Sequence, residues 1–132
     1  MKVLLADDSG LFIDRMQDML SVYRKLEITG CYSRGTEALK ALRSSRPDLA
    51  ILELRLPGLS ALELIREARK EKLPTRFIVV SLFKSDPIRW SVHRAGAEYF
   101  FSKTTETYKI SQAVSRMIYE EQMISLIEEI VA

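Results

Sequence analysis

The chain alternates between short runs of apolar residues and longer stretches in which apolar residues recur every three or four positions. Short apolar runs indicate strands, and the longer period is typical of helices that bury one face. Strands are predicted over residues 2–6, 26–32, 49–53, 76–81 and 98–102. Helices are predicted over residues 12–23 and 35–44, from Ala61, from Pro87, and after a cap at Thr105. The order is strand then helix, five times.

The predicted strands are apolar along most of their length. Strands of this kind are covered on both faces, as in a parallel sheet with helices on either side. The sequence therefore predicts an α/β fold, a doubly wound five-stranded parallel sheet with helices on both faces. In such sheets ligands bind beyond the carboxyl ends of the strands, so the residues that end the strands are the candidates for function.

Polar side chains end four of the five strands, at Asp7, Asp8, Glu53, Ser81 and Lys103. Any one of them could be a helix cap or a solvated strand end, but caps do not explain three acids opposite one lysine. Three carboxylates in one crevice repel one another unless a cation is present, either Mg²⁺ or the lysine. A metal, a hydroxyl and a lysine around a carboxylate also suit phosphoryl transfer to that carboxylate.

Composition narrows the class of protein. A chain of 132 residues suits one domain, and 47% hydrophobic with 29% charged residues is ordinary for a globular chain. No apolar run approaches the roughly 18 residues of a membrane span, and the N-terminus does not resemble a signal peptide. The lone Cys31 has no partner for a disulfide or a CxxC site. We expect a cytoplasmic protein in which Cys31 is a small buried residue.

The charge is unevenly distributed along the chain. The net charge is +2, and the last 13 residues hold four glutamates without a lysine or arginine, which leaves +6 on the rest. The basic residues are spread along the body and form no run, so direct binding of nucleic acid is not indicated. The sequence also lacks GxGxxG, GxxxxGK[ST] and, with one histidine, a Ser-His-Asp set, which argues against a nucleotide-binding enzyme or hydrolase.

Four segments, "LLADDSGLF", "PDLAILELRLPGLSALEL", "FIVVSLF" and "AGAEYFFSKT", together resemble the receiver domain of bacterial two-component response regulators. The resemblance covers residues 2 to about 118 and implies a flavodoxin-like fold and a signalling module that is not an enzyme. It also implies roles for individual residues. They are an Mg²⁺ site from Asp7, Asp8, the residue at position 53 and the backbone carbonyl of Arg55, a hydroxyl at Ser81, the lysine Lys103, and an aromatic switch at Phe100.

Glu53 departs from the family pattern, because it stands where the family carries its phosphoaccepting aspartate. Glutamate moves the carboxylate one methylene, roughly 1.5 Å, further out. A displacement of about 1 Å can cost on the order of 100-fold in a reaction that depends on positioning. We expect a receiver that works without phosphorylation or is constitutively biased. A conventional phosphotransfer-competent receiver, and a substitution made to mimic the phosphorylated state, remain as alternatives.

Two surfaces are candidates for partner binding. On the helix from Pro87, Ile88, Val92 and Ala95 share one side, while Trp90 lies opposite and either packs locally or anchors a partner. Near the C-terminus, an apolar stripe with a period of seven runs through Ile110, Met117, Ile124 and Val131.

The stripe runs from the last helix of a receiver-like domain, residues 1–119, into an acidic amphipathic helical extension, residues 120–132. The last helix either continues into the extension or is followed by a short one. The extension either packs back onto the body or forms a homodimer or partner contact. Expected partners are a histidine kinase or an effector. The chain is either a stand-alone receiver or the excised N-terminal domain of a DNA-binding transcriptional regulator.

Overall fold

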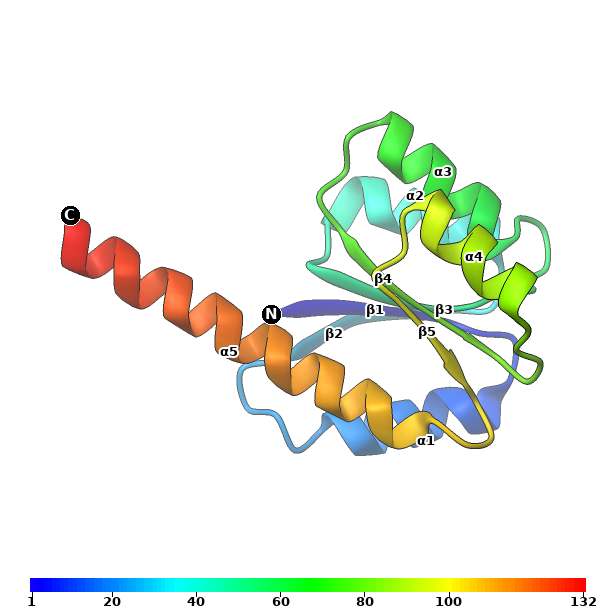
Figure 1. Cartoon of the computed structure of the whole chain (residues 1–132), viewed down its shortest axis with the longest axis horizontal. Coiled ribbons are helices and arrows are strands. Elements are labelled where there is room, and N and C mark those ends of the chain that lie inside the picture. Colours follow the sequence, from blue (N-terminus) through cyan, green and yellow to red (C-terminus); the bar gives the residue numbers. More distant parts are fainter.

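Strands and helices alternate along the whole chain, as the hydrophobic pattern predicts. The computed structural model describes residues 1–132 and contains five strands and five helices (Figure 1). The elements are β1 Lys2–Ala6, α1 Gly10–Leu20, β2 Glu27–Tyr32, α2 Gly35–Ser45, β3 Leu49–Glu53, α3 Ala61–Lys70, β4 Arg76–Ser81, α4 Asp86–Ala95, β5 Tyr99–Ser102 and α5 Thr107–Val131.

The strands form one parallel sheet in the order β2-β1-β3-β4-β5. Helices α1 and α5 cover one face, and α2, α3 and α4 cover the other (Figure 1). Because successive side chains of a strand point to opposite faces, the core divides into a cluster of 21 buried residues and one of 14. The predicted doubly wound fold is confirmed, and the carboxyl ends of all strands lie at one edge.

Helix α3 begins with the predicted capping box. The Ser60 hydroxyl accepts a hydrogen bond from the Glu63 backbone N–H (3.3 Å) and donates one to the Glu63 carboxylate (3.0 Å). This reciprocal pair satisfies donors that the first turn of a helix leaves free. It fixes the point at which the chain leaves the loop after β3.

The predicted cap at Thr105 is wrong. Helix α5 begins two residues later, after Glu106, and Glu106 makes no capping hydrogen bond with its side chain. Its carboxylate is instead engaged by Lys84 and Lys109, so it serves a contact between loops. The first turn of α5 is thus held by its neighbours instead of by its own cap.

Two further expectations fail near the edge strand β2. Helix α1 ends at Leu20, so Tyr23 lies outside it, and the Tyr23 hydroxyl donates a hydrogen bond to the carbonyl oxygen of Ser111 on α5 (3.1 Å). Cys31 is exposed and not buried. Cys31 is exposed because it lies on β2, an edge strand that lacks a neighbour on one side and whose side chains are less covered.

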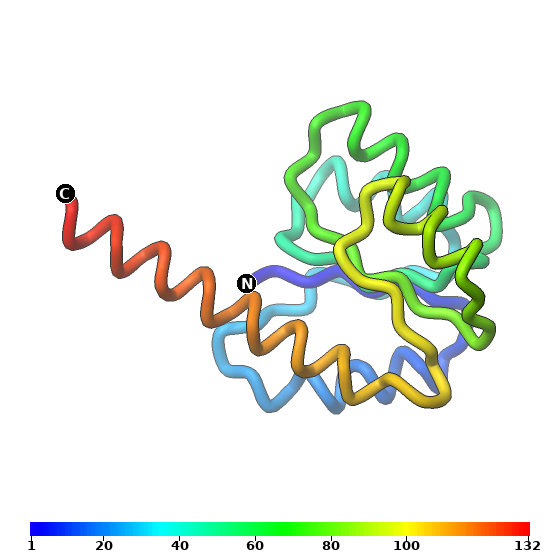
Figure 2. Tube along the Cα trace, viewed as in Figure 1, coloured from blue at the N-terminus to red at the C-terminus, as the bar shows by residue number.

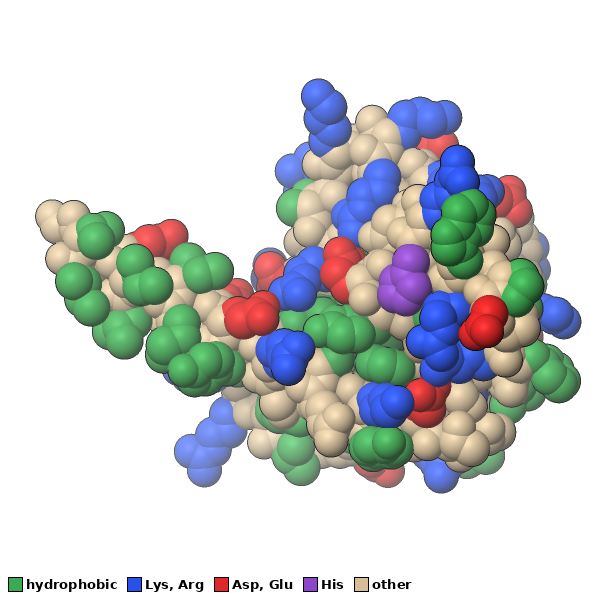
Figure 3. Space-filling view, in the orientation of Figure 1, with side chains coloured by type: hydrophobic (Ala, Val, Ile, Leu, Met, Phe, Trp, Pro, Cys, Tyr) green, Lys and Arg blue, Asp and Glu red, His purple; other side chains and the backbone are tan.

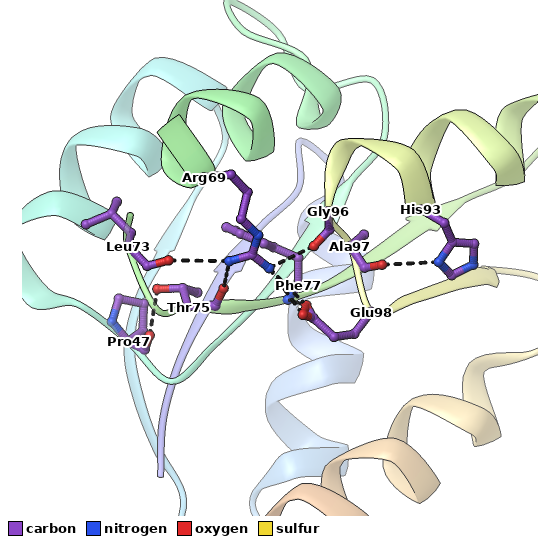
Figure 4. A network of polar contacts seen from close by, with 9 residues as sticks. All are labelled: Pro47, Arg69, Leu73, Thr75, Phe77, His93, Gly96, Ala97 and Glu98. Atoms are coloured by element: carbon purple, nitrogen blue, oxygen red, sulfur yellow. Dashed lines mark hydrogen bonds and ion pairs between the residues drawn. The ribbon is translucent and has the colours of Figure 1, made fainter. Parts of the chain in front are cut away.

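An arginine network, which the apolar pattern does not reveal, ties α3 to the start of β4 and to the turn before β5 (Figure 4). The Arg69 guanidinium donates to the carbonyl oxygens of Thr75 and Gly96, each at 2.7 Å. It also pairs with the Glu98 carboxylate at 3.2 Å, which accepts the Phe77 backbone N–H at 2.7 Å. One side chain therefore satisfies several backbone groups at the amino end of the sheet.

Helix α5 is continuous and longer than the sheet needs. Its first half packs on the sheet through Ile110, Ala113, Val114 and Met117, and no residue after Met117 is buried. The second half projects away from the body, and the C-terminus ends far from the rest of the chain (Figures 1 and 2). The helix therefore continues past the domain without folding back onto it. None of the helices has the combination of length and apolar character that crossing a membrane requires.

Candidate functional site

The carboxyl edge of the sheet brings together three side chains from distant parts of the sequence. Asp7 follows β1, Glu53 is the last residue of β3, and Lys103 follows β5. Strands β1 and β3 are direct neighbours, and the Lys103 backbone N–H donates to the Ser81 carbonyl oxygen at 2.9 Å, which extends the pairing of β4 with β5. The sheet register thus positions two acids and the lysine at the same edge.

The three side chains form a buried ion triad. Lys103 Nζ lies 2.6 Å from Asp7 Oδ2 and 2.6 Å from Glu53 Oε2, and all three side chains are 10% exposed or less. The ammonium also lies over the Phe12 ring, 4.6 Å from its centroid, where a cation is attracted by the ring face. The lysine is thus the shared counter-ion of both carboxylates.

The electrostatics of Lys103 reflect two opposing effects. Burial alone lowers the pKa of the ammonium, because desolvation disfavours the charged form. The carboxylates of Asp7 and Glu53 outweigh this, and the net result is a raised pKa. The two inner oxygens, Asp7 Oδ2 and Glu53 Oε2, are fully buried and accept no hydrogen bond from any other group. Each therefore depends on the lysine for its charge compensation.

The outer oxygens of both acids are held by backbone groups. Asp7 Oδ1 accepts the Ser9 backbone N–H at 2.8 Å, and Glu53 Oε1 accepts the Arg55 backbone N–H at 3.3 Å. Each carboxylate is therefore fixed between a backbone donor on one side and the ammonium on the other. The glutamate side chain at the end of β3 thus reaches a direct contact with Lys103.

The residues in this arrangement do not fit a magnesium ion. Asp8 is exposed and forms no ion pair with Lys103, and no three His, Cys, Asp or Glu side chains are placed together as ligands. The inner oxygens of Asp7 and Glu53 already face the Lys103 ammonium. The contact that Arg55 makes here is its backbone N–H to Glu53, and the role of its carbonyl oxygen as a metal ligand stays a prediction. We therefore assign no chemical step to a metal.

The other residues singled out in the sequence lie around the triad or on the α4 side of the sheet. Ser81 ends β4 and is buried, and its hydroxyl accepts the Phe83 backbone N–H at 3.2 Å. Phe100 is buried in the larger core cluster, on the same face of the sheet as α4. Trp90 is 62% exposed, with the Arg94 guanidinium 4.8 Å from its ring centroid. Trp90 therefore has a local contact and an open face.

A second charged cluster, centred on Glu106, lies beside the triad, and the sequence analysis did not predict it. The Glu106 carboxylate binds the ammonium groups of Lys109 (2.7 Å) and Lys84, and it accepts the Ser102 backbone N–H at 3.0 Å. Hydrogen bonds from Lys109, Lys84 and Ser102, in that order, lower the pKa of Glu106 to about 2. The spacing of Glu106 and Lys109 on one helical turn was visible in the sequence, but the contact with Lys84 depends on the fold.

Known proteins agree with this architecture. The profile of the response regulator receiver domain matches residues 3–115. The response regulator GacA of Pseudomonas aeruginosa is 27% identical over 124 residues, which cover 94% of this chain and 58% of that protein. The nitrate/nitrite response regulator protein homolog of Haemophilus influenzae is 26% identical over 125 residues, covering 95% of this chain and 60% of that one. The chain thus spans little more than half the length of these relatives.

Solved structures give the same result. The signal receiver domain of NarL from Mycobacterium tuberculosis superposes with a TM-score of 0.82 at 28% identity, covering 88% of this chain and 94% of that one. The complex of CheX and CheY with BeF3 and Mg²⁺ from Borrelia burgdorferi superposes with a TM-score of 0.80 at 18% identity, covering 89% of each chain, which is a likeness of fold alone. With its sheet order, its acid and lysine edge and its match to the family profile, this chain belongs to the receiver domains of two-component response regulators.

Proposed function

We propose that this receiver domain signals through protein contacts without being phosphorylated, and that Glu53 holds it in one conformational state. The observation that carries the proposal is the buried ion triad, in which Lys103 Nζ lies 2.6 Å from both Glu53 Oε2 and Asp7 Oδ2. The Glu53 carboxylate, at the position of the family's phosphoacceptor, is already paired with the Lys103 ammonium. The domain then has a permanent form of the charge contact that phosphorylation would otherwise create.

Two features of the triad oppose phosphorylation of Glu53. The inner oxygen of Glu53 is buried against the ammonium and would have to leave it before attacking a phosphorus atom. The extra methylene displaces the carboxylate by roughly 1.5 Å, and a displacement of this size costs on the order of 100-fold in rate. Both effects act in the same direction, so acyl phosphate formation at Glu53 is disfavoured.

The proposed output is a protein surface on the α4 side of the sheet. Phe100 lies buried under this side and Trp90 stands exposed on α4, which supports roles as switch residue and partner anchor. The proposed partners are a histidine kinase or an effector protein, together with a second copy of this chain bound through the last helix. We place the boundary between the receiver domain and the extension at residues 119 and 120, two residues after the last buried position of α5.

Phosphorylation with a small donor tests the proposal. The parent and the Glu53→Asp variant are incubated with acetyl phosphate and Mg²⁺, and their intact masses are compared. We expect the parent to stay unmodified and the variant to gain one phosphoryl group. The shorter aspartate restores the family's phosphoacceptor and withdraws its carboxylate from Lys103, which would open the edge to the Mg²⁺ that the triad with Glu53 excludes. Stable phosphorylation of Glu53 in the parent would contradict the proposal.

A further inference from the structure

A groove lies between α4 and the segment that links β3 to α3, and it is called the α4 groove below. Its walls are residues 54–56 after β3, Ser60 and Leu62 at the start of α3, and part of the first half of α4. Its volume is about 550 Å³. Sites that bind small molecules have volumes of roughly 300 to 1,000 Å³, so the α4 groove is large enough for such a ligand.

The inner surface of the α4 groove is apolar. Leu54 and Leu56 are buried members of the larger core cluster, and Leu62 and Ile88 are partly buried and pack against that cluster. The groove is therefore an opening onto the core and not a fold in a polar surface. A ligand with an apolar body gains free energy when it covers such surface, because apolar area is removed from water.

The single charged side chain that lines the α4 groove is that of Arg55. Arg55 is exposed, and its guanidinium forms no ion pair. Two acids lie close in the chain, Glu63 and Asp86, but neither lines the groove. The Glu63 carboxylate already accepts a hydrogen bond from the Ser60 hydroxyl at 3.0 Å. The groove thus offers one cation without a counter-ion.

The surroundings of the α4 groove are also basic. Lys and Arg side chains gather over α3 and α4 in the space-filling view (Figure 3). Helix α4 itself carries Arg89 and Arg94 against one acid, Asp86, and neither arginine forms an ion pair. A surface with an excess of one sign of charge attracts ligands of the opposite sign, so an anionic ligand is favoured here.

A second groove of similar size shows that this combination is specific to the α4 side. It lies along the second half of α5, has a volume of about 590 Å³, and is lined by Glu121 and Glu129 together with Lys25. Its charges are mixed, and they select neither an anion nor a cation. The α4 groove instead joins an apolar inner surface to one cation, which is the pattern of a site for an apolar acid.

Backbone hydrogen bonds hold the Arg55 segment in place without any ligand. The Leu54 N–H donates to the Val80 carbonyl oxygen at 2.9 Å, and the Leu54 carbonyl oxygen accepts the Ala61 N–H at 3.1 Å. The Arg55 N–H donates to Glu53 Oε1 at 3.3 Å. A segment that is already ordered loses little freedom on binding, which favours affinity. The planar guanidinium of Arg55 can also donate two parallel hydrogen bonds to one carboxylate.

We propose that the α4 groove binds a small carboxylic acid with a compact apolar body. The body lies against Leu56, Leu62 and Ile88, and the carboxylate pairs with the Arg55 guanidinium. Such a ligand joins the segment after Glu53 to α4, the helix that carries Trp90. This inference goes beyond the proposed function, which names no small ligand. It holds whether or not Glu53 accepts a phosphoryl group.

Chemical-shift titration of the isotope-labelled full chain tests the proposal, without Mg²⁺ or a phosphoryl donor. The probes are phenylbutyrate and naphthylacetate, each compared with the alcohol of the same body, phenylbutanol and naphthylethanol. We expect shift changes that centre on residues 54–62 and 87–91. Each acid should bind on the order of tenfold more tightly than its alcohol, because a charge-assisted contact is added to the same apolar burial.

Variants then assign the two parts of the ligand. Arg55→Met should remove the tenfold preference for the acids, whereas Arg66→Met, which removes an exposed arginine of α3 outside the groove, should leave it unchanged. Ile88→Ser should weaken acids and alcohols alike, and urea unfolding verifies that this variant remains folded.

Three results would overturn the proposal. They are the absence of binding by both acids, equal affinity for acids and alcohols in the parent, and a preference for the acids that survives Arg55→Met. Since no phosphoryl donor is present, each of these results leaves the mass comparison of the parent with Glu53→Asp unaffected.

Discussion

The carboxyl edge of the sheet and the second half of α5 differ in where their charges and apolar groups find partners. At the sheet edge, two acids and one lysine are compensated within the chain, and the backbone holds the remaining oxygens. Along residues 119–131, the apolar side chains and most of the glutamates have no counterpart in the chain. The charges of the edge are thus compensated within the chain, whereas the apolar side chains of the extension are exposed.

The two regions therefore differ in how a mutation should act. At the sheet edge the charges are compensated inside the chain, so a change there should act through stability. On the second half of α5 the apolar side chains are exposed, so a change there should act through association.

The largest effect is expected from Lys103→Met, which removes the ammonium and keeps the length of the side chain. Asp7 and Glu53 are left as buried carboxylates without a counter-ion, and breaking a buried pair in this way costs about 3 to 5 kcal/mol. The free energy of unfolding, measured by urea at pH 7, should fall by this amount. The measurement is made with EDTA and again with Mg²⁺, because a metal that replaced the lysine would recover part of the loss.

The matched variant for Lys103→Met is Lys2→Met, which removes an exposed lysine from the first strand. Surface changes of this kind usually alter stability by less than about 0.5 kcal/mol. If Lys103→Met proved equally mild, the triad would not be the tightly compensated cluster described above, and the contrast with the extension would be lost.

An effect on association alone is expected from Ile127→Ser, which places a hydroxyl among the exposed apolar side chains in the second half of α5. The homodimer proposed to form through the last helix should weaken on the order of 30-fold, as for a central contact residue. The free energy of unfolding of the body should change by less than about 0.5 kcal/mol, because Ile127 is exposed in the monomer. Sedimentation measures the effect on association, and urea unfolding measures the effect on stability. Ser125→Ala, a polar position in the same half of α5, is the control and should change neither quantity.

Much of the fold and part of the site could be predicted from the sequence. The bounds of β1, β3 and β4 follow from apolar runs, and the convergence of Asp7, Glu53 and Lys103 follows from the rule that parallel strands end at one edge. These features depend on local pattern and on the geometry common to all such sheets. For the same reason they survive at low sequence identity to known receivers.

Other features could not be predicted, because they depend on contacts between distant side chains. The sequence shows that Lys103 can neutralise the acids but not that Asp8 stays outside the triad. It offers Thr105 as a cap, yet the N-cap residue is Glu106, and the carboxylate of Glu106 is held by Lys84 and Lys109. The seven-residue stripe through α5 is visible in the sequence. Only the structure shows that the second half of α5 projects away from the body (Figure 1).

The smallest expected effect concerns the cluster around Glu106, which joins the loop after β4 to the loop after β5 next to the ion triad. The folded state lowers the pKa of Glu106 from 4.5 to about 2, first through the hydrogen bond from Lys109 and then through those from Lys84 and Ser102. A carboxylate with a lowered pKa stabilises the fold fully above pH 4.5 and loses that contribution as the pH falls toward 2. Glu106→Gln should therefore be less stable than the parent at pH 7, and the difference should shrink steadily between pH 4.5 and 2.

Urea unfolding at a series of pH values measures the difference between Glu106→Gln and the parent. Hydrogen exchange of residues 82–87 reports whether the loop after β4 opens more often once its contact with Lys84 is weakened. The control is Glu121→Gln, on the extension, whose carboxylate makes no ion pair. If the two variants gave the same pH dependence, Glu106 would be an ordinary surface acid. Only the ion pairs of the triad would then stabilise this edge of the sheet, and the contacts of Glu106 with Lys84 and Lys109 would add nothing to it.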